Sequence, residues 1–326
     1  MNPTPMFDVR QLSVTFGRPT LLGRLAGRAP VVGLRAIDLL VHTGETLALV
    51  GESGSGKSTL ARSMLRLNRV SAGALLFQGR EITNLEGAPL RALRRRLQMI
   101  FQDPVSSLNP RLSVGRAIAE SLIIHDLARG REIAERVAAS LAMVGLPGHL
   151  ATRMPHQFSG GQRQRICIAR ALCCSPQFIA CDEVLSALDM SLQGQILDLL
   201  ERLKGEMGLT YLFISHDLRV VRRIADRVAV MYLGRIVELA TTRDLYAHPA
   251  HPYTQALLAA VPTADPVVEH ARRFVALAGE PPSPANPPPG CAFHERCPRA
   301  TARCRTELPP LAHIAPGHQV ACFHPS

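Results

Sequence analysis

The apolar residues of this chain follow two spacings, which separate strands from helices. Short apolar runs of three to ten residues predict strands. They cover residues 7–16, 35–41, 46–50, 74–77, 99–101, 177–181, 210–214, 227–232 and 235–239. Longer stretches with apolar residues at i and i+4 predict helices. They cover residues 58–68, 162–171, 191–206 and 218–224. Strands that alternate with helices predict an α/β fold whose mainly parallel sheet is covered on both faces.

One region breaks this alternation. From Pro110 to Leu146 the period is helical throughout, with Ile118 and Leu122 as one i, i+4 pair and Val137 and Leu141 as another. We therefore expect a helical subdomain of about residues 103–165 inserted into the α/β core.

The composition changes near two points of the chain. Gly, Pro and Arg mark residues 17–32 as an exposed loop, and the sequences PTADP and PPSPANPPPG mark a linker after Val261. We predict a main domain of residues 1–262 and a Pro- and Cys-rich extension of residues 263–326. No signal-peptide pattern and no run of 18 apolar residues occurs, so we expect a cytoplasmic protein.

Charge narrows the choice of partners only slightly. The net charge is +11, and 47% of the residues are hydrophobic with no Trp. This composition indicates a globular protein with an anionic partner, which is nucleic acid, an anionic membrane surface or a nucleotide.

The clearest chemical motif is GESGSGKST, directly after the apolar run 46–50. It fits the G-x-x-x-x-G-K-[ST] phosphate loop, in which backbone amides and a helix N-terminus surround a triphosphate. We expect Lys57 to contact the β- and γ-phosphates and the Ser58 hydroxyl to hold Mg²⁺. The chain has only one other lysine, Lys204, which supports a specific need for a compact ammonium at this loop. The predicted nucleotide-binding residues of the loop are Gly51, Glu52, Ser53, Gly54, Ser55, Gly56, Lys57, Ser58 and Thr59.

Two further motifs mark the two ends of the predicted helical insertion. Gln102 ends an apolar strand, where its carboxamide would contact Mg²⁺ or the attacking water. The sequence HQFSGGQRQR contains a small-residue turn at a helix start, which is a second anion site. Its predicted nucleotide contacts are Ser159, Gly160, Gly161 and Gln162.

Polar residues also end two predicted strands of the core. FIACDE places Asp182 where it would bind Mg²⁺ through water, and Glu183 where it would accept a proton from the attacking water. SALD follows and ends at Asp189, and His216 ends the next strand. Singly, each motif is an ordinary turn or helix cap, so it is their order along the chain that indicates a site.

These six motifs together resemble an ABC-transporter ATPase subunit. GESGSGKST, Gln102, SGGQ, the Asp182–Glu183 pair, SALD and His216 are similar to its phosphate loop, Q-loop, signature, Walker B, D-loop and switch histidine. The likeness covers about residues 7–262. QDPVSSLNPR, PHQFSGGQRQR, VMYLGRIVE and HPYTQALLAAVP resemble more narrowly the oligopeptide/dipeptide importers, and most of all the second of their paired ATPases.

The resemblance implies an assembly and a mechanism. Two such subunits would enclose two ATP molecules, with Ser159 and Gly161 contacting the partner's nucleotide, Asp189 near the same interface and Phe16 stacking on adenine. Glu183 would act as base, with His216, Lys57 and Mg²⁺ stabilising the transferred charge. The expected partners are a second ATPase subunit in a heterodimer, two transmembrane permease subunits and an extracytoplasmic solute-binding protein, but no nucleic acid. The chain would lie at the cytoplasmic face of the membrane and power uptake of di- or oligopeptides or a related small solute.

The chain departs from the family pattern at two places. Phe158 stands before the signature where Leu is common, and Val184 and Leu185 follow Glu183 where the family usually has Pro. Without proline, we expect a looser turn after Glu183. We still expect hydrolysis, because every group that takes part in the chemistry is present.

The eight cysteines form two groups. Cys167, Cys173, Cys174 and Cys181 lie in apolar patterns typical of buried thiols. Cys291, Cys297, Cys304 and Cys322 lie in the tail with the spacing C-x5-C-x6-C-x17-C, which favours a metal over disulfides in a cytosolic chain. Resemblance to importer subunits favours a [4Fe–4S] cluster, while zinc and no metal remain alternatives. His294, His313 and His324 are possible substitute ligands.

Two other functions fit parts of the sequence. A DNA-repair or chromosome ATPase of the ABC type would suit the basic charge, but it would need a long coiled-coil or zinc-knuckle insertion or a second ATPase half. A non-hydrolysing regulatory subunit would rest on Val184 and Leu185 alone. Relatives with nearly the same ATPase move peptides, nickel chelates, glutathione or sugars, because the binding protein and permease select the cargo.

Overall fold

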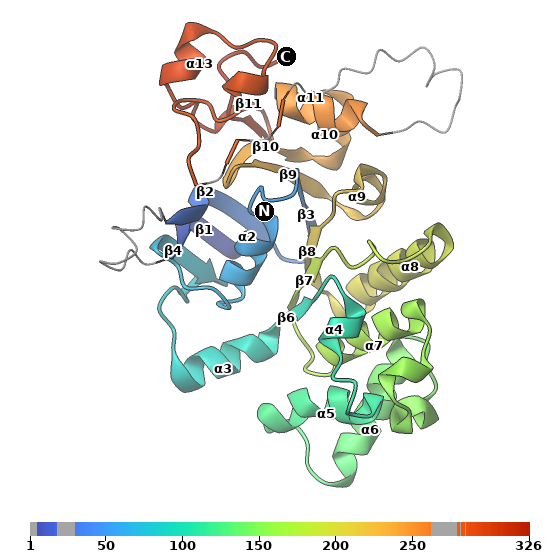
Figure 1. Cartoon of the computed structure of the whole chain (residues 1–326). Coiled ribbons are helices and arrows are strands. Elements are labelled where there is room, and N and C mark those ends of the chain that lie inside the picture. The colour runs from blue at the N-terminus through green and yellow to red at the C-terminus, as the bar shows by residue number, and fades with distance from the viewer. Residues whose placement is uncertain (1–4, 18–29, 262–278, 281, 284) are drawn as a thin grey trace. The chain divides into compact units, whose positions relative to one another are not determined.

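The computed structural model describes residues 5–17, 30–261, 279–280, 282–283 and 285–326. The chain divides into two compact units (Figure 1). The first comprises residues 1–42, 46–83 and 215–326, and the second comprises residues 43–45 and 84–214.

The first unit contains two groups of strands. One is an antiparallel sheet in the order β2-β1-β4-β5, and the other has the order β11-β12-β10-β9-β3. In the second group β3 and β9 are parallel, whereas the remaining pairs are antiparallel. The strands are β1 (Pro5–Phe16), β2 (Val31–His42), β3 (Thr46–Val50), β4 (Ala72–Phe77), β5 (Arg80–Glu81), β9 (Arg227–Tyr232), β10 (Arg235–Thr241), β11 (Ala312–Ala315) and β12 (His318–Val320).

The helices of the first unit are short. They are α2 (Lys57–Met64), α9 (Leu218–Ile224), α10 (Thr242–Ala247), α11 (Pro252–Ala259), the 3₁₀ helix η3 (His294–Arg296) and α13 (Ala302–Thr306). Helix α2 is shorter than the predicted helix 58–68. The chain leaves it because Arg66 adopts a positive φ of 55°, and the amides of Leu67 and Asn68 turn back to the Arg62 carbonyl.

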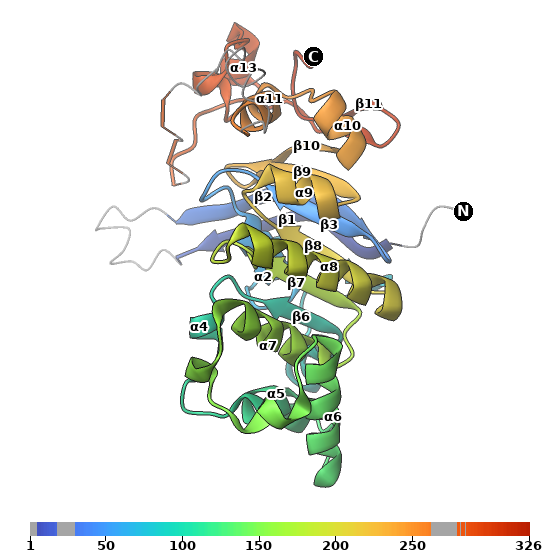
Figure 2. The same cartoon turned by 90° about the vertical axis from the view of Figure 1, so that its right-hand side faces the viewer.

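The second unit has a small parallel sheet in the order β8-β7-β6. Helices α5 and α6 lie within the region predicted to be a helical insertion, and α7, which was predicted as a core helix, packs against both, as Figure 2 shows. The elements are α3 (Gly87–Arg96), β6 (Leu97–Ile100), α4 (Pro104–Ser107), α5 (Val114–Ile124), α6 (Arg131–Met143), η1 (Gly148–Thr152), η2 (Pro155–Gln157), α7 (Gly160–Leu172), β7 (Phe178–Asp182), α8 (Met190–Met207) and β8 (Thr210–Ile214).

The predicted α/β fold with a P-loop strand–helix pair is confirmed, but the sheets are mixed. Strands β1, β2 and β4 form an antiparallel sheet that the apolar runs did not reveal, because pairing direction depends on distant segments. Most of the predicted loop at 17–32 and most of the linker after Val261 lie outside the described residues.

The C-terminal tail is part of the first unit. Strand β12 pairs with β10, matching Glu238 with Val320 and Leu239 with Gln319. Phe293 of the tail lies in a buried cluster with residues of β3, β9, β10, α9 and α11. The domain bounds 1–262 and 263–326 remain a prediction, and the described part of that extension adds two strands to the sheet that holds β3.

Candidate nucleotide-binding site

The predicted phosphate loop joins β3 to α2 and is held close to two other segments. Gly51 has φ 147° and Gly56 has φ 103°. A Cβ atom at Gly51 would lie 2.2 Å from the Met231 carbonyl oxygen, and one at Gly56 would lie 2.7 Å from the Gly33 carbonyl oxygen. Both positions therefore require glycine, for conformation and for space.

Lys57 directs its ammonium into this loop. Its Nζ donates to the carbonyl oxygens of Gly51 at 2.8 Å and Glu52 at 2.9 Å, and lies 3.4 Å from Ser55 Oγ. The side chain is 6% exposed. Lys57 is also the first residue of α2, so the positive helix end and the ammonium face the same loop. This arrangement is suited to binding an anion.

Phe16, the predicted adenine-stacking residue, lies beside the loop helix. A Cβ atom at Gly33 would lie 2.8 Å from Phe16 Cε2 and 3.2 Å from Thr59 Cγ2. The ring therefore packs over Gly33 next to the start of α2, and 42% of Phe16 is exposed. A partly exposed aromatic face in this place is able to stack on a base.

Glu52 has contacts that the sequence did not indicate. Its amide donates to the Tyr253 hydroxyl at 2.7 Å, and its carboxylate accepts two hydrogen bonds from Arg296 at 2.7 and 2.9 Å. Tyr253 lies in HPYTQALLAAVP, a stretch that the sequence marks only as a family likeness. Nothing in the local pattern around Arg296 marks it as a neighbour of the loop.

In the second unit, β7 brings two predicted site residues to its carboxyl end. Asp182 is the last residue of the strand and is 3% exposed. Glu183 follows with φ 48°, a conformation that costs about 1 kcal/mol for a non-glycine residue. Gln102 Nε2 donates to Glu183 Oε2 at 2.7 Å, so these two residues, 81 positions apart, are in direct contact.

The turn after Glu183 is held without proline. Val184 and Leu185 are buried, and both the amide and the hydroxyl of Ser186 donate to the Glu183 carbonyl oxygen. Gln193 Nε2 donates to the Leu185 and Leu188 carbonyls at 3.2 and 3.1 Å. Without proline we expected a looser turn. Burial and these four hydrogen bonds hold it instead.

The SGGQ motif forms the N-terminus of α7. Ser159 Oγ accepts from the Gln162 amide, and Gln162 Oε1 accepts from the Ser159 amide, which makes a capping box. Ser159 and Gly160 are exposed, whereas Gly161 is buried where a Cβ atom would lie 3.2 Å from Leu192. The motif therefore presents a serine and a helix N-terminus at the surface of its unit.

Asp189 has a structural role as well as its predicted one. It caps α8 by accepting from the Leu192 amide at 2.9 Å and from Ser191 Oγ at 2.8 Å, and these hydrogen bonds keep its pKa below the usual value.

The remaining site residues are divided between the two units. Ser58 and His216 belong to the first unit, and Asp182 and Glu183 belong to the second. That His216 braces Glu183, and that Ser58 and Asp182 share Mg²⁺, stay predictions.

The four tail cysteines line one small pocket. Burial raises the pKa of Cys291 to about 11, and it also raises the pKa values of Cys297 and Cys322. Among the described residues, no three His, Cys, Asp or Glu side chains stand close enough together to hold one metal ion. The four thiols therefore share a pocket, but in the described part of the chain they are not arranged as a finished metal site.

Comparison with known proteins places the chain in a family. Residues 34–186 match the ABC transporter family, and residues 237–304 match the oligopeptide/dipeptide transporter C-terminal region. The chain is 48% identical to the oligopeptide transport ATP-binding protein AppF of Bacillus subtilis, over 98% of both chains. It is 51% identical to a probable peptide ABC transporter ATP-binding protein, y4tS, of Sinorhizobium fredii, over 95% of this chain and 88% of that one.

Solved structures agree with this placement. A dimeric post-hydrolysis state of the ATP-binding cassette MJ0796, bound to ADP and phosphate, is 28% identical, with a TM-score of 0.64 over 73% of this chain and 99% of that one. CbiO1 of Clostridium perfringens, part of an ABC transporter complex, is 27% identical, with a TM-score of 0.65 over 75% of this chain and 91% of that one.

Among the helices that the structure describes, none has both the length and the apolar character needed to cross a bilayer. As an ABC ATPase it hydrolyses ATP, dimerises and acts with transmembrane permease partners. The chain belongs to the ABC-transporter family, as an ATP-binding subunit of the oligopeptide/dipeptide transporter type.

Proposed function

We propose that this chain is one of two different ATPase subunits that power an importer of di- or oligopeptides. The observation that carries the proposal is 48% identity to an oligopeptide transport protein over 98% of both chains, including the C-terminal region typical of that type. The second ATPase, the two permease subunits and the solute-binding protein complete the importer. The chain then lies at the cytoplasmic face of the membrane.

ATP binds by its phosphates to residues 51–59 and by its adenine to Phe16. Contacts inside the first unit support this assignment, because Lys57 Nζ, the start of α2 and the Phe16 ring all lie around the same loop. The signature residues Ser159, Gly160, Gly161 and Gln162, together with Asp189, face the nucleotide held by the partner subunit.

Glu183 accepts the proton of the water that attacks the γ-phosphate, and Gln102 orients this carboxylate through their 2.7 Å hydrogen bond. Lys57 and His216 stabilise the charge that moves onto the leaving and transferred groups. Mg²⁺, bound through Ser58, Gln102 and Asp182, would neutralise phosphate charge. Gln102 begins the segment that leads to α4 and α5, so nucleotide state reaches the helical region through it.

The hydrolysis assignment is tested with Glu183→Gln, which keeps the shape and the contact with Gln102 but removes the base. We expect MgATP binding to persist while turnover falls by at least about a hundredfold. Turnover near the wild-type rate would contradict the role of Glu183. Binding without turnover in the wild-type pair would instead support the non-hydrolysing alternative.

The cargo is tested by recovering the permease with a tagged chain and reconstituting the complex in vesicles. Uptake of labelled di- and tripeptides supports the proposal if it requires MgATP and is lost in Glu183→Gln. Uptake of nickel chelates or glutathione with no peptide uptake would overturn it. Recovery of two copies of this chain with no second ATPase would overturn the heterodimer.

We also propose that Cys291, Cys297, Cys304 and Cys322 hold a [4Fe–4S] cluster as a structural clip. The observation that supports a shared site is that the four thiols line one small pocket. A cluster is bound by sulfurs at separated corners, and it supplies covalent cross-links between segments of the tail. Anaerobically purified protein should contain about four iron atoms per chain. Colourless protein without iron, or with one zinc, would contradict the proposal.

A further inference from the structure

The C-terminal tail reaches the phosphate loop through a single arginine. Arg296 ends η3, which lies between Cys291 and Cys297 in the sequence. Its Nη1 donates to Glu52 Oε2 at 2.7 Å and its Nη2 donates to Glu52 Oε1 at 2.9 Å, a bidentate pair with a residue 244 positions away. Bidentate guanidinium–carboxylate pairs set orientation as well as distance, so Glu52 is held in one direction.

The pair is shielded on the arginine side. The Arg296 side chain is 6% exposed, and that of Glu52 is 26% exposed. The hydrogen bonds to Glu52 raise the pKa of Arg296 above its ordinary value. Because the guanidinium is always charged and mostly removed from water, loss of Glu52 would leave it poorly compensated. This pair therefore restrains the loop more than a surface ion pair does.

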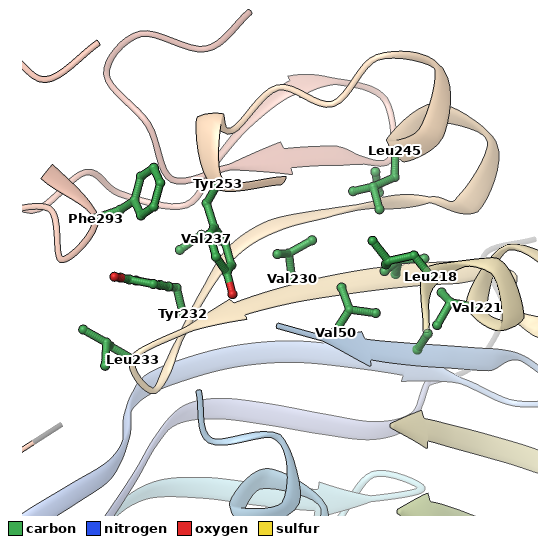
Figure 3. Close-up of a cluster of buried hydrophobic side chains, with 13 residues drawn as sticks. Val50, Leu218, Val221, Val230, Tyr232, Leu233, Val237, Leu245, Tyr253 and Phe293 are labelled. Atoms are coloured by element: carbon green, nitrogen blue, oxygen red, sulfur yellow. The ribbon is translucent and has the colours of Figure 1, made fainter. Parts of the chain in front are cut away.

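Aromatic residues fix the position of Arg296. Its guanidinium carbon lies 5.9 Å from the Phe293 ring centre and 6.0 Å from that of Tyr232. The rings of Tyr232, Tyr253 and Phe293 stand 4.8 to 5.4 Å apart, and Figure 3 shows them together at one end of the buried cluster. Tyr232 is also the neighbour of Met231, whose carbonyl faces Gly51.

A second contact holds Glu52 by its own backbone. The Tyr253 hydroxyl accepts a hydrogen bond from the Glu52 amide at 2.7 Å, and Tyr253 is fully buried. Glu52 is thus held at two points: Tyr253 of α11 binds its amide, and Arg296 of η3 binds its carboxylate. Its carbonyl oxygen in turn accepts from Lys57 Nζ at 2.9 Å. A change in the direction of Glu52 therefore moves an acceptor of the lysine predicted to contact phosphate.

We propose that Arg296 is a positioning residue through which the C-terminal tail holds the phosphate loop in its nucleotide-binding conformation. The inference rests on the proposed assignment of residues 51–59 as the ATP site. It holds whatever group the tail cysteines bind, because the contacts run through η3 and α11. The tail thereby acts on ATP affinity, in addition to adding strands to the sheet.

The test measures MgATP affinity of the purified full chain and the steady-state kcat and KM of the assembled ATPase pair. We expect Arg296→Ala to raise Kd and KM for MgATP about tenfold while kcat changes less than about threefold. Arg296→Lys should recover part of the affinity, since it keeps a charge but loses the fork. Arg129→Ala removes a comparable but exposed pair with Asp126 and should leave Kd unchanged.

A double-mutant cycle separates positioning from general loosening. Glu52→Gln alone should weaken MgATP binding, and the double variant Glu52→Gln/Arg296→Ala should bind about as weakly as Arg296→Ala alone. Effects that add fully, or an Arg296→Ala chain that is folded and binds with wild-type affinity, would overturn the inference. If Arg296→Ala does not fold, Arg296→Lys and Glu52→Gln decide the question, since each weakens the Arg296–Glu52 pair and both should raise Kd.

Failure of the ATP-site assignment gives a different result. Lys57→Ala tests that assignment directly and should abolish MgATP binding. If Lys57→Ala binds as the wild type does, the phosphate-loop assignment itself is wrong. If Lys57→Ala fails to bind and Arg296→Ala binds normally, only the role of Arg296 is wrong.

Discussion

Gly51 meets two demands that no other residue type satisfies together. Its φ of 147° lies where side chains are strained, and the Met231 carbonyl oxygen occupies the place of a Cβ atom. Gly54 in the same loop has φ 79° but nothing within 4 Å of its Cβ position. The two glycines therefore separate the effect of backbone strain from that of steric contact.

We expect Gly51→Ala to lower the free energy of unfolding by about 3 kcal/mol and to abolish MgATP binding, because β9 and the loop must move apart. Gly54→Ala should cost only about 1 kcal/mol, which is the strain of a left-handed alanine. Urea unfolding of both variants measures the difference. Equal losses of stability would show that contact with Met231 has no part in it.

The thiol of Cys291 offers a pH-dependent test. Burial raises its pKa to about 11, so the thiol is protonated at neutral pH and the reactive thiolate becomes more abundant as pH rises. In metal-free protein, alkylation of Cys291 by iodoacetamide should be slow at pH 7 and should accelerate about tenfold per pH unit up to pH 10. Mass spectrometry of the labelled peptide follows the rate, with Cys291→Ser as the blank. A rate that is already maximal at pH 7 would contradict a raised pKa.

The sequence predicted the local structure around the phosphate loop, Gln102, Glu183 and the SGGQ helix start, because each follows a strand or begins a helix in a fixed local pattern. It placed Glu52 only as one of nine loop residues. Glu52 contacts Tyr253, 201 positions away, and Arg296, 244 positions away. These contacts depend on how the distant segments fold back onto the loop.

Strand β12, which lies between β11 and β10, is attached to β10 by a buried polar pair. His318 Nε2 lies 2.7 Å from Glu238 Oε1, and the Glu238 side chain is fully buried. The same carboxylate accepts from the amides of Ala250 and His251 at 2.7 and 2.9 Å. One side chain of β10 thus joins the start of α11 to the C-terminal strand, and every partner satisfies part of a buried acceptor.

His318→Ala should lower the free energy of unfolding by about 2 kcal/mol, since it removes a buried hydrogen bond to a carboxylate. It should also increase amide hydrogen exchange in β12. His149→Ala serves as the control, because His149 is exposed in η1 of the second unit and its loss should cost less than about 0.5 kcal/mol. Exchange in β12 that is the same in both variants would exclude this anchor.

Several elements have the bounds that their apolar patterns predicted. Strands β3, β8 and β9 and helix α9 begin and end at the expected residues. The strands are short, almost entirely buried apolar runs, and α9 buries its apolar residues while its arginines are exposed. The strands β11 and β12 were missed. They lie in a Pro-rich tail whose apolar residues are few, and β12 exists as a strand through pairing with β10.

At the level of the assembly, the proposed function assigns the exposed Ser159 and Gly160 at the start of α7 to a nucleotide held by another subunit. In the presence of MgATP, we expect the Glu183→Gln variant and the second ATPase subunit to elute as a stable pair in size-exclusion chromatography. The reason is that ATP contacts both subunits and is not hydrolysed. This chain with MgATP alone should stay monomeric. A pair formed equally well by this chain alone would indicate a homodimer.

By itself, the sequence determined the fold class, the order of the ATPase motifs and the chemistry of the phosphate loop, since these depend on local patterns and residue types. Only the tertiary structure decided three further features. They are the mixed direction of the sheets, the direct contact of Gln102 with Glu183, and the hydrogen bonds from Arg296 of the C-terminal tail to Glu52. Each depends on packing between segments far apart in the chain. The order of residues constrains such contacts only through the complete fold.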